Sequence, residues 1–137
     1  MNLSPSLIRR AAILYFGFQA FAVAAWWVVL FAWPPARAPF KSADAPDSVL
    51  LAFVVADLSF VAAASGAVTY GLVRRSAWTW PVLLLHTGAA AYASLYCLTV
   101  FVQNEGSGWL AAVLMLQGVT VIPWFAWRLR PQSSVER

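Results

Sequence analysis

Four long runs of apolar residues constrain the fold of this chain more than any other feature. They occupy residues 11–33, 49–73, 82–102 and 109–127, and each is between 19 and 25 residues long. A bilayer core about 30 Å thick needs about 20 residues of helix to cross it. Only helices and closed barrels satisfy backbone hydrogen bonds in lipid, and these runs lack the alternation of barrel strands. The runs therefore predict four transmembrane helices.

The composition indicates the same class of protein. Hydrophobic residues make up 62% of the 137 residues and charged residues only 10%, whereas a soluble domain carries about 25% charged residues. The first run continues well beyond the length of a signal-peptide core, so we predict a retained helix. We expect an all-α integral membrane four-helix bundle, one domain over residues 1–137. Its helices are predicted at about 8–33, 49–73, 79–102 and 108–128.

Positive charges are distributed unevenly between the connections. Seven of the nine Lys and Arg residues lie before the first run, between the second and third, or after the fourth; the other two are Arg37 and Lys41. Cytoplasmic loops carry an excess of Lys and Arg, so we predict that both termini are cytoplasmic. This topology accounts for the net charge of +4, and we predict no nucleic-acid binding.

Small residues in the second and third runs predict how the helices pack. The pairs Ala62/Gly66 and Ala89/Ala93 have the four-residue spacing that lets two backbones approach closely in lipid. We therefore expect the second and third helices to form the tightest pair.

The connection between the first two helices is the longest one. It contains four prolines between residues 34 and 47, which favour an extended or partly stiff segment. Asp47 or Ser48 is expected to cap the second helix, because both residue types accept hydrogen bonds from free backbone amides.

The inventory of reactive side chains is short. With only one cysteine, Cys97, and one histidine, His86, the chain cannot form an internal disulfide or a closed zinc site. It has no P-loop, GxSxG or HExxH motif. We predict no metal and no cofactor.

One carboxylate interrupts an apolar run. Asp57 lies within FVVADLSFVAAA, residues 53–64. Charged residues in membrane spans are costly and usually functional, so we predict that Asp57 has a functional role. The alternative is a structural role, in which Asp57 forms a hydrogen bond to Tyr96 or Gln117. Because burial disfavours the charged form of a carboxyl group, this one could donate a proton or bind a cationic ligand.

His86 is the second candidate catalytic residue. On straight helices it lies two to three turns from Asp57, too far for a direct pair, and nearer Ser65, Thr69 and Thr120. A structural histidine that shares a proton with Thr69 or a backbone carbonyl is at least as well supported.

Depth along the helices places further side chains around Asp57. They are aromatic or amide side chains that could wall a cavity. For Gln19 an interhelical hydrogen bond is the default interpretation. The predicted ligand-binding residues are Trp26, Tyr92, Tyr96, Gln117, Trp124 and Gln19.

The stretch from the second helix to the fourth resembles the EXPERA domain of the emopamil-binding protein and the sigma-2 receptor. It combines Asp57 in the outer half of the second helix, a basic turn, and a Y..LY.LT-like stretch at residues 92–99. Gln117, a few positions before Pro123, completes the pattern. The resemblance implies a cavity that opens to lipid and accepts a rigid hydrophobic molecule, with Asp57 as its polar anchor.

The first helix departs from that family. Isomerases of the family are expected to carry a histidine and an acid there, one turn apart. This chain has Gln19 near the histidine position and only Ala24, Ala25 and Trp26 near the acid. Sterol isomerisation by that acid/base pair is therefore not predicted.

Three functions follow as hypotheses. The first is intramembrane binding of a rigid sterol-like or isoprenoid molecule at Asp57, with proton transfer to a lipophilic alkene if the chain is an enzyme. The second is a small accessory subunit of a larger membrane complex. The third is a dimeric transporter like the small multidrug-resistance proteins, ranked last because their acid lies in the first helix.

The setting of the protein follows from composition. Arginine outnumbers lysine eight to one, which favours a GC-rich bacterial genome and the inner membrane. The expected partners are a lipophilic small molecule and the bilayer. The sequence leaves open whether the chain forms a homodimer or joins a larger complex.

Overall fold

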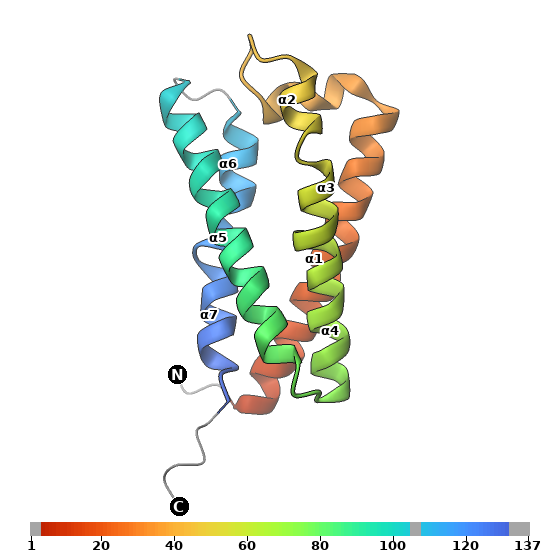
Figure 1. Cartoon of the computed structure of the whole chain (residues 1–137), viewed down its shortest axis with the longest axis vertical. Coiled ribbons are helices and arrows are strands. Elements are labelled where there is room, and N and C mark those ends of the chain that lie inside the picture. Colours follow the sequence, from red (N-terminus) through yellow and green to blue (C-terminus); the bar gives the residue numbers. More distant parts are fainter. Residues whose placement is uncertain (1–3, 105–107, 132–137) are drawn as a thin grey trace, which may run out of the picture.

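The computed structural model describes residues 4–104 and 108–131. Its helices pack side by side as a bundle (Figure 1), which confirms the predicted fold class. Four helical stretches are long and apolar enough to cross a membrane, and each lies within three residues of its predicted bounds. They are Pro5–Ala32, Asp47–Arg74, Thr79–Gln103 and Trp109–Arg128. The chain is thus an integral membrane protein.

The first and third spans are continuous α-helices. The first, α1 (Pro5–Ala32), begins with Pro5 behind the N-cap Ser4, whose side chain accepts a hydrogen bond from the Leu7 amide. The third, α5 (Thr79–Gln103), carries Pro81 in its first turn, where proline breaks no helical hydrogen bond.

The second span is interrupted. It runs through α2 (Asp47–Leu51) and α3 (Val54–Ala56) into the π-helical segment η2 (Asp57–Ala63), and then α4 (Ala64–Arg74). Asp57 is the first residue of the π segment. Such segments are rare, and they occur frequently at functional sites.

The fourth span is interrupted as well. A short 3₁₀ turn, η3 (Leu116–Gly118), separates α6 (Trp109–Met115) from α7 (Val121–Arg128). At this break the Ser94 hydroxyl of α5 lies 2.5 Å from the Met115 carbonyl oxygen and 2.6 Å from that of Ala90. Irregular backbone at membrane depth is tolerated where neighbouring groups satisfy it, and α5 supplies such a group here.

The connection after α1 is more regular than expected. Its first part forms a 3₁₀ helix, η1 (Pro34–Phe40), where an extended or partly stiff segment was expected. The predicted cap of the second span was also wrong, because Pro46 occupies the N-cap position without a side-chain bond. Asp47 lies in the first helical turn, where its Oδ2 pairs with Arg37 at 2.7 Å and its Oδ1 with Lys41 at 3.5 Å.

The helix packing differs from the prediction. The second span packs more extensively against α1 than against α5, so the second and third helices are not the tightest pair. A Cβ added at Gly66 would meet nothing within 4 Å, whereas one added at Gly17 would lie 3.6 Å from the Thr69 side chain. Of these two glycines, the one that contacts a neighbouring helix is therefore on α1 and not in the predicted small-residue pair.

The main buried cluster lies in the half of the bundle where α1 begins and α7 ends (Figure 1). It joins residues of α1, α4, α5 and α7 and includes Phe16, Val68, Leu83, Ile122 and Phe125. The start of α1 and the end of α7 lie at the same end of the bundle, as four crossings require.

Candidate functional site

A layer of polar side chains crosses the middle of the bundle. Gln19 comes from the centre of α1, Ser65 from α4 and His86 from α5. All three are buried, with exposed fractions of 5% for Gln19 and 0% for the other two. Because buried polar groups in lipid are costly without partners, their hydrogen bonds decide what this layer can do.

His86 joins three helices through both of its ring nitrogens. Its Nδ1 lies 2.8 Å from the carbonyl oxygen of Phe60 in the π segment. Its Nε2 lies 3.2 Å from Gln19 Oε1 and 3.3 Å from Ser65 Oγ, and the Ser65 hydroxyl donates to Gln19 Oε1 over 2.8 Å. Phe16 packs against the imidazole ring edge-on.

The hydrogen-bond partners of His86 determine which of its ring nitrogens carries a proton. The Phe60 carbonyl oxygen can only accept, so Nδ1 carries a proton. A second proton on Nε2 would donate to Gln19 Oε1. In the neutral ring Nε2 is an acceptor, and Gln19 must then turn its amide nitrogen toward the imidazole, or the Ser65 hydroxyl must donate to Nε2 instead. A change of protonation at His86 is thus coupled to the hydrogen bonds of Gln19 and Ser65.

We expect neutral His86 to be the Nδ1–H tautomer. The test is ¹⁵N NMR of protein labelled at histidine and prepared without added histidines, because His86 is the only one in the chain. A protonated Nδ1 with an unprotonated Nε2 would agree with the hydrogen bond to Phe60. The Nε2–H tautomer, which prevails for exposed histidine side chains in the control spectrum of the denatured protein, would contradict it.

These contacts bear on the predictions for the layer. The expected proximity of His86 to Ser65 is confirmed, as is the alternative in which His86 bonds a backbone carbonyl. Thr69 is not the partner, since its buried hydroxyl has no hydrogen bond to any residue that the structure describes. Gln19 makes the interhelical bond that was its default interpretation.

Asp57 lies one turn from Phe60 on the same π segment and is partly buried. The indole N–H of Trp27 donates to its Oδ2 over 3.2 Å. Its Oδ1 accepts no hydrogen bond from the described residues and is not sealed inside the bundle.

The expected structural partners of Asp57 bond elsewhere or face other groups. Gln117 Oε1 accepts a hydrogen bond from the Tyr15 hydroxyl at 2.5 Å. Tyr96 packs its ring against Phe53, with centroids 5.5 Å apart, one turn before Asp57 along the second span. The Trp27 indole therefore takes the place that the sequence assigned to these side chains.

The other predicted ligand-binding residues are spread over the bundle. Trp26 packs against the ring of Phe40 in η1, with centroids 3.8 Å apart, and against the neighbouring Trp27. Tyr92 is 75% exposed on α5. Trp124 packs against Phe125 in α7. Of the predicted set, Tyr96 is the residue with a contact beside Asp57.

Sequence reasoning missed Trp27 and Tyr15 as polar partners. Each carries a hydrogen-bonding group inside an apolar run, and this signal was present in the sequence. Comparison with models of known protein families, with curated proteins and with solved structures finds no match.

Proposed function

We propose that this protein binds a rigid lipophilic molecule within the membrane and holds it at the carboxyl group of Asp57. The observation that carries the proposal is the asymmetry of that carboxyl group: Oδ2 is bonded to Trp27, whereas Oδ1 has no donor among the described residues. Hydrocarbon offers no water to satisfy this oxygen, so a ligand with a hydroxyl or amine is its natural partner.

The surroundings of Asp57 fit such a ligand. Tyr96 and Phe53 form an aromatic pair one turn before Asp57 along the second span. The partly exposed position of Asp57 allows approach from the lipid. Apolar and aromatic walls with one or two placed polar groups are the usual features of small-molecule sites.

The ligand class that we propose is a sterol-like or isoprenoid molecule. The resemblance to the EXPERA domain supports it, and we propose that family relationship together with a location in the bacterial inner membrane. If the protein is an enzyme, protonated Asp57 would give its proton to an alkene carbon, and a base would remove a proton from the adjacent carbon of the cation. The candidate for that base is His86, which contacts Gln19 and the Phe60 carbonyl oxygen one turn along the second span from Asp57.

The test is small-molecule mass spectrometry on protein purified in mild detergent. Wild type, Asp57→Asn and Asp44→Asn are compared; the last makes the same chemical change in the connection outside the membrane. We expect a hydrophobic compound to copurify with wild type and Asp44→Asn. The amount bound should be at least about tenfold lower in folded Asp57→Asn, because loss of the carboxyl group removes a charge-assisted hydrogen bond. Equal amounts in all three proteins would contradict the proposal.

A second candidate function is that of an accessory subunit. Gly66 of α4 and Gly88 of α5 both face away from the rest of the described chain, since an added Cβ would meet none of its atoms within 4 Å at either position. Small residues on a lipid-facing surface allow close approach of another helix. If wild type retains no compound and instead purifies as a complex or dimer that Gly66→Leu disrupts, this function would replace the first.

A further inference from the structure

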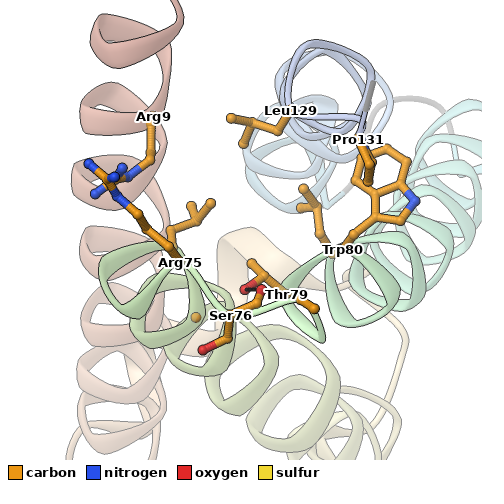
Figure 2. A pocket seen from close by; sticks show the side chains of 11 residues that line it. Arg9, Arg75, Ser76, Thr79, Trp80, Leu129 and Pro131 are labelled. Atoms are coloured by element: carbon orange, nitrogen blue, oxygen red, sulfur yellow. Dashed lines mark hydrogen bonds between the residues drawn. The ribbon is translucent and has the colours of Figure 1, made fainter. Parts of the chain in front are cut away.

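A hollow of about 280 Å³ lies at the end of the bundle where α4 turns into α5 (Figure 2). Its apolar walls include Leu72, Leu83 and Leu129. Ser76 and Thr79 line it as well, and Arg9 and Arg75 enter it from α1 and from the turn. The hollow lies beyond the end of α4, several turns of helix from Asp57, and plays no part in the proposed ligand site.

Both arginines line this hollow. Arg9 extends from α1 and Arg75 from the turn after α4, and in Figure 2 both side chains run to the side of the hollow next to α1. Two like charges placed together repel, so the arrangement favours an anion between them. Guanidinium groups bind phosphate through paired N–H donors, which is why arginine recurs at phosphate sites.

No carboxylate among residues 4–104 and 108–131 pairs with either arginine. The acids in this part of the chain are Asp44, Asp47 and Asp57. Asp47 pairs with Arg37 and Lys41 at the opposite end of the bundle, and Asp57 lies in mid-membrane. The neighbouring Arg74, by contrast, stacks over the ring of Tyr70.

The backbone at Arg75 is a second, independent observation. Arg75 has φ +56° and ψ +37°, the left-handed conformation that follows many helices and is usually occupied by glycine. A side chain there costs about 1 kcal/mol or more relative to glycine. The arginine at this position is therefore unfavourable for the turn itself and adds a cation to the hollow.

We propose that Arg9 and Arg75 together bind a phosphate group, supplied by the headgroup of an anionic phospholipid. Arg74 ends the second span and Thr79 begins the third, so the hollow lies at the border of the membrane where lipid phosphates are found. Under the predicted topology this is the cytoplasmic leaflet, whose anionic lipids attract basic segments. The apolar walls beside Trp80 and Leu129 accommodate the first carbons of the lipid.

The test is native mass spectrometry of the full chain in a non-ionic detergent, titrated with phosphatidylglycerol or with phosphatidylcholine of the same chains. The variant Arg9→Gln/Arg75→Gly removes the proposed pair, and glycine suits the backbone of the turn. The variant Arg10→Gln/Arg74→Gln removes the same number of charges from the adjacent positions. Thermal unfolding of each variant without lipid verifies that it is folded.

We expect phosphatidylglycerol to bind wild type, and its affinity to fall about tenfold further in the first variant than in the second, because paired charge-assisted hydrogen bonds are lost. Equal losses in both variants, or equal affinity for phosphatidylcholine, would overturn the proposal. A parallel titration with inorganic phosphate distinguishes the source of the group. If inorganic phosphate displaces the lipid in wild type, the arginines do bind phosphate, but the natural ligand is a free phosphate ester and the lipid assignment is overturned.

Discussion

Replacing His86 with alanine should lower the free energy of unfolding by about 2–4 kcal/mol, because a cavity forms and buried hydrogen-bonding groups lose their partner. Two groups are affected most directly. The carbonyl oxygen of Phe60 loses its donor, and the Gln19 amide loses a neighbour 3.2 Å away. In lipid neither group finds water as a replacement.

Two further variants separate the contributions of the ring nitrogens. The amide nitrogen of His86→Asn falls near the position of Nδ1 and can still donate to Phe60, whereas that of His86→Gln falls near Nε2. If the bond to the π segment stabilises the bundle most, His86→Asn should retain more of the stability than His86→Gln. The measurement is reversible unfolding in mixed detergent micelles. An alanine variant as stable as wild type would show that the π segment does not depend on His86.

Replacing Gly118 with alanine should destabilise the bundle by about 1–3 kcal/mol, the usual cost of inserting a methyl group into a packed contact. A Cβ at this position would lie 2.9 Å from the carbonyl carbon of Ala90 and closer still to the Ser94 hydroxyl. The Ala90 carbonyl belongs to the backbone of α5 and cannot move aside as a flexible side chain could. The methyl group would therefore push α5 from η3, where Ser94 contacts the Met115 carbonyl.

The chain offers matched controls for this change. Gly66→Ala and Gly88→Ala add the same methyl group where nothing lies within 4 Å. Each should be neutral or stabilise by up to about 1 kcal/mol, because alanine favours helix more than glycine does. Thermal unfolding of the three variants in one detergent compares them directly. Equal loss in all three would mean that Gly118 does not lie at a close helix contact.

The sequence predicted how deep a residue lies along its helix better than which way its side chain faces. The predicted depth of His86 placed it at the level of Ser65, and the structure agrees. Direction was wrong at α1, where Trp26 was expected beside Asp57 and Trp27 donates the hydrogen bond. One residue corresponds to about 100° of rotation around an α-helix, so the two tryptophans face different neighbours.

The second span shows why direction could not be predicted. An apolar helix in lipid has no polar face that fixes its rotation, because lipid tails are as apolar as the helix interface. The π segment at Asp57–Ala63 then changes the rotation of everything that follows it. Gly66 was expected between helices because of its spacing from Ala62, but it follows the π segment and faces outward.

The sequence by itself determined the number of spans, their bounds and their class, because a bilayer requires about 20 apolar residues for each crossing and accepts no unsatisfied backbone. Only the tertiary structure decided which side chains meet: Trp27 with Asp57, Tyr15 with Gln117, and His86 with Gln19, Ser65 and the π segment. These pairings depend on rotation and on close packing of neighbouring helices, which hydropathy along one chain does not encode.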